Sequence, residues 1–345
     1  MREAAAETPF QTAGKVPKVI NIITVEISSK WWYILTRMVF SKEKLYRQIP
    51  KIISRDTSIA SHGGDVMKIG FIGAGKVGFS LGRYLKDNEY TVIGYYSRSM
   101  ASAEDAANFT GTKIFDTMKQ IVEVSDVLFL TIPDGEIASV WDKLMNFDLT
   151  GKVICHCSGA LSSHIFSNIE NHNAYGYSVH PFLAISDKYK SHQDIKSAFF
   201  TIEGSNERLD EVAKIFTSCG NRVQVISPEN KVKYHAAASI VSNFAVTLSD
   251  MAAGLLAECG FGEDNIFAAL GPIMLGNTKS IIQNGTAKAL TGPIERGDTE
   301  TVKKHISVLS KDDRELYICL AKRTLELAKR KHPDRDYMAL MEVLQ

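Results

Sequence analysis

One glycine-rich run constrains the fold of this 345-residue chain more than any other feature: Gly73-Ala74-Gly75-Lys76-Val77-Gly78. It follows a short apolar stretch over 68–72 and opens a segment over 76–86 with helical apolar spacing. A G-x-G-x-x-G pattern in this strand–turn–helix context is typical of a dinucleotide-binding turn, although the bare pattern also occurs in ordinary glycine-rich turns. We therefore predict that all six residues of the run contact a dinucleotide.

The three glycines have separate expected roles in such a turn. Gly73 would allow the tight bend, Gly75 would let a pyrophosphate approach the backbone, and Gly78 would let helix and strand pack closely. The N-terminus of the following helix would offer free N–H groups and the positive end of its dipole to the phosphates.

The chain after Met67 alternates between strand-like and helix-like segments. Short apolar strands are predicted over 68–72, 90–96, 113–115, 126–131, 152–157, 174–179, 198–202 and 222–226. Helices are predicted over 76–86, 101–109, 116–123, 135–145 and 206–218. This alternation indicates βαβ units and a parallel sheet. The expected fold class is therefore α/β, with a Rossmann-type doubly wound sheet over 67–226.

The pattern changes after Pro228, where long segments rich in Ala and Leu follow with few strand signals. Helices are predicted over 231–258, 263–271, 299–310 and 312–331. The sequence thus predicts an all-helical C-terminal domain over 227–345.

Residues 1–66 differ from the rest of the chain in composition. They carry ten of the 40 Lys and Arg residues but six of the 39 Asp and Glu residues, so the remainder is mildly acidic. Their most apolar stretch, 31–40, is interrupted by Thr36 and Arg37 and is too short to span a bilayer. A secretory signal pattern is absent from them. We expect 1–66 to be a non-native extension or a disordered segment, with translation starting at Met67.

Charge and cysteine content exclude several classes of protein. The net charge is +1, which gives no global positive field for nucleic acid, and neither a nucleic-acid nor a membrane partner is expected. Five cysteines are too few for a disulfide scaffold and fit a reduced, cytoplasmic compartment. Cys155 and Cys157 share one face of a strand while His156 points away, and no second pair follows at zinc-ribbon spacing. We therefore expect no metal.

The end of the second predicted strand indicates which dinucleotide binds. It reads Ser97-Arg98-Ser99, without the Asp or Glu that NAD enzymes place on the ribose hydroxyls. Arg98 can pair with a 2′-phosphate and the serines can donate hydrogen bonds to it, although an Arg on a solvated loop is common. We predict NADP as the cofactor, with NAD less favoured. Ile132 and Pro133, after the fourth strand, would lie beside the nicotinamide ribose.

A polar turn follows the fifth predicted strand, at the sheet edge where ligands of doubly wound folds bind. Ser158 and the N–H of Gly159 could hold a substrate carboxylate or carbonyl there. The alternative is a strand-to-helix turn with Ser162 as the N-cap. His180, which ends another predicted strand, can face the same cleft.

One predicted helix carries a stripe of uncharged polar residues. No charged residue occurs over 234–249, and His235, Ser239, Ser242 and Asn243 share one side at about 100° per residue. A surface helix normally carries charges on its wet side. We therefore expect this helix to be buried on all sides, with the stripe facing the coenzyme cleft or, alternatively, another helix. His235 would be the proton donor or acceptor.

A further cluster lies between the predicted helices of the C-terminal half. Gly292, Pro293 and Gly297 would form a rigid bend. Arg296 could bind an anionic substrate group or merely brace this bend, and Asp298 would cap the helix that begins at 299.

These motifs keep the order found in a known two-domain family. The chain resembles proteins with a Rossmann-like module followed by a helical domain of unknown function, which are often described as NADP oxidoreductases. The resemblance covers about 67–325 and rests on residues 70–78, 97–99, 156–162, 180–181, 234–243 and 290–298. More distantly, the chain is similar to ketopantoate reductase, pyrroline-5-carboxylate reductase and the β-hydroxyacid dehydrogenases. In ketopantoate reductase Lys, Asn and Asn occupy the positions of His235, Ser239 and Asn243, so the reaction does not transfer directly.

The resemblance implies hydride transfer between NADP(H) and a small carbonyl or imine substrate. His235 would move the proton, Ser239 and Asn243 would position it, and Ser158 would orient the substrate. Relatives of this type also imply a homodimer through the helical domain. Two alternatives remain: a non-catalytic NADP-binding sensor or partner protein, and a deazaflavin–NADP reductase.

Overall fold

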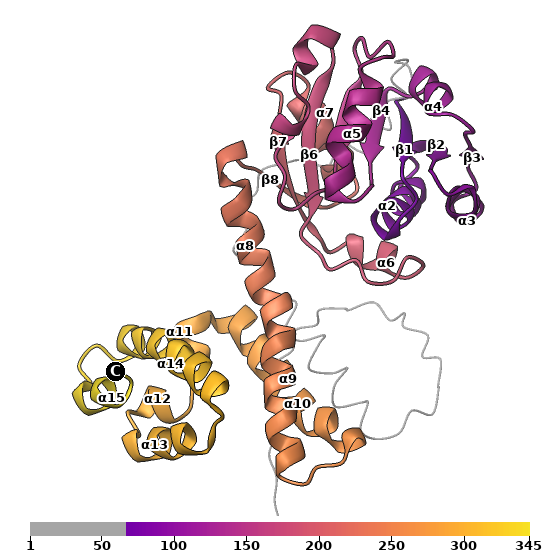
Figure 1. The fold of residues 1–345 in the computed structure, drawn as a ribbon. Helices are drawn as coiled ribbons and strands as arrows, with labels where there is room; N and C mark the ends of the chain where they lie inside the picture. The colour runs from indigo at the N-terminus through magenta and orange to yellow at the C-terminus, as the bar shows by residue number, and fades with distance from the viewer. Residues whose placement is uncertain (1–66) are drawn as a thin grey trace, which may run out of the picture. The chain divides into compact units, whose positions relative to one another are not determined.

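The eight predicted strands form one sheet, in the order β3-β2-β1-β4-β5-β6-β7-β8 (Figure 1). The structure is a computed structural model that describes residues 67–345, so the predicted extension over 1–66 lies outside it. The strands are β1 (Lys68–Ile72), β2 (Thr91–Tyr96), β3 (Lys113–Ile114), β4 (Val127–Leu130), β5 (Val153–His156), β6 (Tyr175–Pro181), β7 (Phe199–Gly204) and β8 (Arg222–Val225). The pairs are parallel except β6 with β7. The predicted α/β class is confirmed.

Helices cover both faces of the sheet (Figure 1). One core lies between the strands and α2 (Lys76–Asp87), α3 (Met100–Thr110), α6 (Ser191–Ile195) and α7 (Leu209–Thr217). The other core lies beneath α4 (Met118–Val124) and α5 (Asp134–Leu144), together with the short 3-10 turns Ser163–Ile165 and Ile169–His172.

The apolar strands supply both cores because successive side chains point to opposite faces. Phe71 and Phe129 stack at 5.5 Å between ring centroids in the first core, while Ile72, Leu128 and Leu130 lie in the second. A strand buried on both faces reads as a continuous apolar run, as parallel sheets require.

The remaining elements are helices, as predicted, and begin after a 3-10 turn at Pro228–Asn230. They are α8 (Lys231–Val241), α9 (Asn243–Glu258), α10 (Glu263–Asn284), α11 (Thr286–Ala289), α12 (Pro293–Arg296), α13 (Thr299–Val308), α14 (Lys311–Lys331) and α15 (Met338–Val343).

Two of the predicted helix boundaries in this region are wrong. The helix over 231–258 is divided at Ser242, whose ψ of −71° departs from helical geometry. The helix predicted to end at 271 continues through Pro272, because a proline removes one N–H without excluding helical backbone on either side.

A separate small core joins α13, α14 and α15 around Val302, Leu325 and Leu340. Asp298 accepts the N–H of Thr301 at 3.1 Å, which confirms its predicted role as an N-cap.

The bend over 290–298 is braced by a residue that the sequence analysis did not single out. Glu295 makes ion pairs with Lys331 and Arg335 and a hydrogen bond with His332, all in the segment that ends α14. These contacts anchor the bend, and a role for Arg296 in binding an anion stays a prediction.

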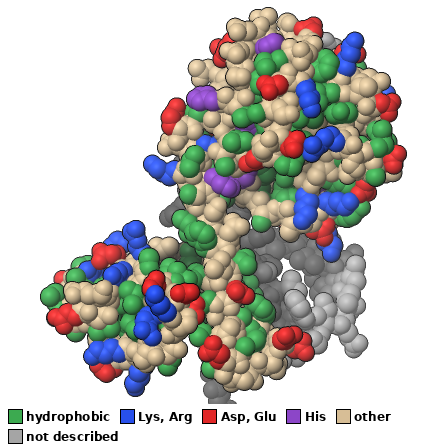
Figure 2. Space-filling model, in the orientation of Figure 1, with side chains coloured by type: hydrophobic (Ala, Val, Ile, Leu, Met, Phe, Trp, Pro, Cys, Tyr) green, Lys and Arg blue, Asp and Glu red, His purple; other side chains and the backbone are tan. Residues whose placement is uncertain are grey.

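The expectation that the 234–249 helix is buried on all sides is wrong. Among the described residues, α9 has no buried side chain, and Phe244 and Val246 are 57% and 71% exposed. Large apolar side chains of α10 are also exposed, including Leu275 and Ile282, and Figure 2 shows hydrophobic side chains gathered along these helices. The uncharged pattern reflects an apolar surface, but residues 67–345 leave most of this surface uncovered.

The stretch Pro228–Glu258 is long and apolar enough to cross a membrane, with a mean hydropathy of 1.5 over its most apolar window. Helices in the cores of water-soluble proteins satisfy the same criterion.

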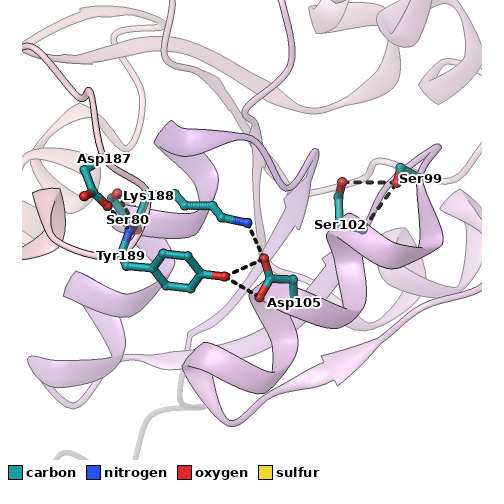
Figure 3. A network of polar contacts seen from close by, with 7 residues as sticks. All are labelled: Ser80, Ser99, Ser102, Asp105, Asp187, Lys188 and Tyr189. Carbon is teal, nitrogen blue, oxygen red and sulfur yellow. Dashed lines mark hydrogen bonds and ion pairs between the residues drawn. The ribbon is translucent and has the colours of Figure 1, made fainter.

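The segment after β6 returns to the sheet's first helices (Figure 3). Lys188 forms an ion pair with Asp105 of α3, and the Tyr189 hydroxyl donates to the same carboxylate at 3.0 Å. The Ser80 hydroxyl of α2 donates to the carbonyl oxygen of Lys188 at 3.2 Å. These contacts fix the chain that leaves the carboxyl end of β6, where His180 lies.

Candidate functional site

The turn between β1 and α2 has the geometry that the glycine motif predicts. Gly73 has a φ of +104°, its N–H donates to the carbonyl of Tyr96 at 2.8 Å, and the Thr131 hydroxyl donates to its carbonyl at 2.8 Å. A Cβ on Gly78 would lie 2.2 Å from Oγ1 of Thr131. Glycine is therefore required at 73 by the backbone and at 78 by the close approach of α2 to Thr131.

Gly75 differs from both, because a Cβ there would meet only the carbonyl oxygen of Thr131, at 3.8 Å. It is the N-cap of α2, and within the described chain no side chain caps that helix. Protein packing thus leaves room above Gly75, next to the free N–H groups of the first turn. An anion with the size of a pyrophosphate fits this arrangement.

A pocket at the carboxyl end of β1, β2 and β4, here called the nucleotide pocket, brings together most of the predicted coenzyme contacts. Its lining includes Gly73, Ala74, Gly75, Ser97, Arg98, Ile132 and Pro133. Lys76, Val77, Gly78 and Ser99 do not line it, because Gly78 faces Thr131 and Ser99 caps α3 by accepting the N–H of Ser102. Sequence reasoning missed the apolar liners Met118 and Val140 and the cation Lys143.

Arg98 lies at the mouth of the nucleotide pocket with its side chain 75% exposed. Its guanidinium donates to Glu136 Oε2 at 3.1 Å. An exposed ion pair of this kind contributes little stability, so the guanidinium can exchange its partner for a phosphate at small cost. No Asp or Glu directly follows β2, and the carboxylate that pairs with Arg98 belongs to Glu136 of α5.

The turn after β5 is held together by its own side chains. The Nδ1 atom of His156 accepts the N–H of Ser158 at 3.2 Å, and its Nε2–H donates to the carbonyl of Ser162 at 3.2 Å. Burial lowers the pKa of His156 to about 4, so the imidazole is neutral. Both ring nitrogens are therefore engaged within the turn.

Ser158 occupies the centre of the same turn. Its hydroxyl donates to Asp134 Oδ2 at 2.6 Å and accepts the N–H groups of Ala160 at 3.2 Å and Leu161 at 2.9 Å. The turn is thus capped by Ser158, and the predicted N-cap role of Ser162 is wrong, since its side chain makes no capping bond. A role for Ser158 in orienting a substrate stays a prediction.

Gly159 lies where two imidazoles converge. A Cβ added there would be 2.5 Å from Nδ1 of His235 and 3.0 Å from Nε2 of His180. The two rings are perpendicular, with centroids 6.4 Å apart. Glycine at this position lets both nitrogens approach one point at the carboxyl edge of the sheet.

His180 and His235 differ in how their nitrogens are used. Nδ1 of His180 forms a hydrogen bond of 2.8 Å with the Tyr234 hydroxyl, which leaves Nε2 toward Gly159. Burial lowers the pKa of His180 to about 3. Nδ1 of His235 is buried and has no hydrogen-bond partner in the part of the chain that the structure describes.

A second pocket, here called the histidine pocket, lies between the end of β6 and α8. Its lining comprises His180, Phe182, Leu183, Ala184, His235, Ala238, Ser239, Val241, Ser242 and Asn243. All four residues of the predicted polar stripe line this one pocket, together with His180. The stripe therefore faces a cleft rather than another helix of the described chain.

The turn after β5 lies next to residues of both pockets. Pro133 lines the nucleotide pocket, the adjacent Asp134 accepts the hydroxyl of Ser158, and Gly159 contacts the histidine pair. The described residues contain no group of three or more His, Cys, Asp or Glu side chains that could hold a metal ion.

Sequence reasoning missed Lys231, which is 1% exposed at the start of α8. It lies four residues before His235, on the same helix face as the polar stripe, and this spacing is the signal that could have found it. Asp134 was also missed as the partner of Ser158.

The comparisons with known proteins agree with this architecture. Residues 56–181 match the family described as a Rossmann-like domain, and residues 198–324 match the domain of unknown function DUF2520. The chain thus combines a Rossmann-like domain with a DUF2520 domain. The DUF2520 match begins near β7, inside the sheet, so it includes the last two strands as well as the helices.

Several solved structures share the fold of this Rossmann–DUF2520 chain. Protein TM1727 from Thermotoga maritima is 28% identical, with a TM-score of 0.62 over 76% of this chain and 99% of that one. A Bacteroides fragilis protein described as an NADP oxidoreductase is 22% identical, with a TM-score of 0.60 over 75% and 98%. Plasmodium falciparum pyrroline carboxylate reductase, solved with NADP bound, is 14% identical, with a TM-score of 0.53 over 78% and 99%. A search of curated proteins finds no match.

Proposed function

We propose that this Rossmann–DUF2520 protein is an NADP-dependent oxidoreductase that transfers a hydride between NADP(H) and a small carbonyl or imine substrate. One observation carries the proposal. The bond between Asp134, which follows Pro133 of the nucleotide pocket, and Ser158 connects this region to the turn beside the histidine pair. Two imidazoles close to a dinucleotide pocket form an arrangement suited to proton transfer coupled to reduction.

The coenzyme would be held by the residues of the nucleotide pocket. The N–H groups that follow Gly75 would bind the pyrophosphate, and Ser97 and Arg98 would bind the 2′-phosphate of NADP. Ile132 and Pro133 would lie beside the nicotinamide ribose. When bound, the nicotinamide supplies or accepts the hydride.

The substrate would enter the histidine pocket. His235 would hold or release the proton at its buried Nδ1, because that atom has no partner among the described residues. Ser239 and Asn243, one and two turns further along, would position the substrate's polar atoms, with Ser158 supporting the turn beneath them. The apolar liners Phe182 and Leu183 favour a small substrate with an apolar portion.

The function is tested by NADPH oxidation over a panel of 2-oxo acids, aldehydes, cyclic imines and an oxidised deazaflavin. We expect turnover with a carbonyl or imine. Turnover confined to the deazaflavin would contradict the proposal, and NADPH binding without turnover of any compound would favour a sensor.

The same assay identifies the proton donor. The His235→Ala variant should lose 10²–10⁴-fold in turnover, the usual range for removing a general acid or base, while NADPH affinity changes little. His305→Ala on the exposed face of α13 is the matched control and should retain full turnover. Unchanged turnover in His235→Ala would remove this residue from the mechanism.

We also propose that the protein is a homodimer whose second copy covers α8, α9 and α10. The described chain exposes large apolar side chains on all three helices, for example Ile240, Val246 and Leu275. Charges on α9 are confined to Asp250 and Glu258. Exposed apolar patches of this extent mark interaction sites, and a second copy brings an identical apolar face to this one.

A further inference from the structure

Lys231 is the one buried side chain of α8, with 1% of its surface exposed. Its Nζ atom has no hydrogen-bond partner among residues 67–345. The ammonium lies 5.4 Å from the centroid of the Tyr234 ring, whose hydroxyl is bonded to His180. Burying an amine without a hydrogen-bond partner is unfavourable, so its presence here requires an explanation.

The charge of this amine interacts with titratable groups from four other elements. They are Asp134 at the start of α5, His156 and Cys157 at the end of β5, His180 on β6 and Glu203 on β7. Tyr234 lies beside the amine on α8, and His235 lies next to His180. Both carboxylates already have partners, because Glu203 accepts the N–H and the hydroxyl of Ser163 and Asp134 accepts the hydroxyl of Ser158. The lysine therefore has counter-charges nearby but none bonded to it.

The protonation states in this cluster are unequal. Burial lowers the pKa of Lys231 to about 8, so the amine remains mostly charged at neutral pH. Burial and, to a smaller extent, the nearby lysine charge lower the pKa values of His156 and His180 to about 4 and about 3. At neutral pH the cluster thus contains an ammonium next to the neutral imidazoles of His156 and His180.

We propose that Lys231 is the proton reserve of the histidine pocket and supplies, through His180 and His235, the proton that reduction of a carbonyl or imine consumes. This inference rests on the proposed function. NADPH adds a hydride to the carbon of the substrate double bond and becomes NADP⁺, and the π electrons of that bond move to its oxygen or nitrogen atom. The N–H of the imidazole that lines the pocket gives its proton to that atom while the other ring nitrogen takes up a proton supplied by Nζ of Lys231, so the ring stays neutral throughout. The amine then regains its proton from solvent.

Lys231 acts here as a positioning residue, because it does not line the histidine pocket and acts through the imidazoles that do. Two substitutions separate proton supply from charge. Lys231→Met removes both, and removal of a buried charge without a bonded partner should leave the fold intact. Lys231→Arg keeps the charge but cannot release a proton at accessible pH. The exposed neighbour Lys233→Met is the matched control.

The first readout is the pH profile of turnover with whichever substrate the panel identifies. The wild-type rate should fall as the pH rises through about 8, since the reserve is then deprotonated. Both Lys231 variants should lose about 100-fold or more in turnover and lack this alkaline limb, whereas Lys233→Met keeps it. Rescue by Lys231→Arg, or an unchanged alkaline limb in Lys231→Met, would overturn the inference.

The second readout needs no turnover. The ring C–H resonances of His180 and His156 are followed by NMR against pH in the NADPH-bound protein. In Lys231→Met their pKa values should rise toward the ordinary histidine value, and in Lys231→Arg they should remain low. Unchanged histidine titrations in Lys231→Met would contradict the inference. Failure of the wild type to reduce any compound would instead refute the proposed function, so the two failures are distinguishable.

Discussion

The hydroxyl of Tyr234 lies 2.8 Å from Nδ1 of His180, and this bond ties the first C-terminal helix to the edge of the sheet. The two rings meet edge to face with centroids 5.6 Å apart. Because one nitrogen of His180 is bonded to the tyrosine, the other is directed toward Gly159 and the His235 ring. The orientation of the candidate catalytic pair thus depends on a contact between residues 54 positions apart in sequence.

The glycines of the β1–α2 turn should respond differently to the same substitution. Gly75→Val should leave thermal stability unchanged and weaken NADPH binding at least tenfold, because the new side chain enters open space that the pyrophosphate needs. Gly73→Val should instead destabilise the fold by about 2 kcal/mol or more, since it combines a φ of +104° with a Cβ 2.6 Å from the Thr131 carbonyl. Calorimetry and fluorescence titration with NADPH measure the two effects. Equal NADPH affinity in wild type and Gly75→Val would count against this turn as the phosphate site.

Arg98 should determine the choice between coenzymes. Arg98→Ala should weaken NADPH binding roughly tenfold, the low end of what a charge-assisted hydrogen bond contributes at an exposed site. NADH binding is the internal control and should stay the same, because NADH lacks the 2′-phosphate. Glu136→Gln should tighten NADPH binding, since it frees the guanidinium from its present partner. A wild-type protein that binds NADH more tightly than NADPH would refute the assignment.

Gly159→Ala should impair the histidine pair without affecting the coenzyme. The added methyl group would overlap Nδ1 of His235, at 2.5 Å, and press on Nε2 of His180, at 3.0 Å. A displacement of catalytic groups by about 1 Å can cost 10²-fold in rate, so turnover should fall 10- to 100-fold while NADPH affinity stays constant. Gly262→Ala, where a Cβ meets open space, is the control for steady-state kinetics. Full turnover in Gly159→Ala would show that the pair does not take part in the reaction.

Protein stability should decrease as the pH falls below about 6.5. His156 and His180 have ordinary pKa values of 6.5 in the unfolded chain but about 4 and about 3 when folded, so the unfolded state binds more protons in between. Their contribution to stability is complete above about pH 6.5 and is lost progressively toward pH 3–4. His180→Gln should flatten the dependence of the free energy of unfolding by up to about 1.4 kcal/mol per pH unit between pH 6 and 4, and His305→Gln should not. Urea denaturation at each pH supplies the measurement.

The apolar face of α9 and α10 should control the oligomeric state. Val246→Asp and Leu275→Asp place a charge at positions that are 71% and 73% exposed in one chain, and each should raise the dimer dissociation constant at least 100-fold. Val308→Asp, 73% exposed on α13, is the control and should leave the dimer intact. Analytical ultracentrifugation over a concentration series distinguishes these states. A wild type that is monomeric throughout, or that sediments with lipid vesicles, would exclude a second copy as the occupant.

Much of the fold follows from the sequence because its signals are local. Runs of three to seven mostly apolar residues, separated by segments with helical spacing, predicted all eight strands, and the glycine spacing predicted the turn at 73–78. The direction of β7 could not be predicted, since its antiparallel pairing with β6 depends on the path of the connection between the two strands. The helix break at Ser242 contains no proline or glycine, so the sequence did not predict it.

The candidate site could be predicted only in part, for a physical reason. His235, Ser239 and Asn243 share a helix face, so periodicity alone groups them and the histidine pocket contains all three. Gly159 lies next to the imidazoles of His180 and His235, which belong to two other elements. Contacts between three separate elements are not encoded in any local sequence pattern. The burial of Lys231 could not be predicted from the sequence, because it arises from contacts outside its own helix.

With the proposed homodimer, the exposed faces of α9 and α10 mean that the active form would be assembled in two stages. The sheet and the small core of α13 to α15 have their apolar contacts within one chain, whereas the helices that carry the polar stripe would be covered only on association. Specific activity would then rise with protein concentration until all chains are dimeric, and extreme dilution would inactivate molecules that still bind coenzyme.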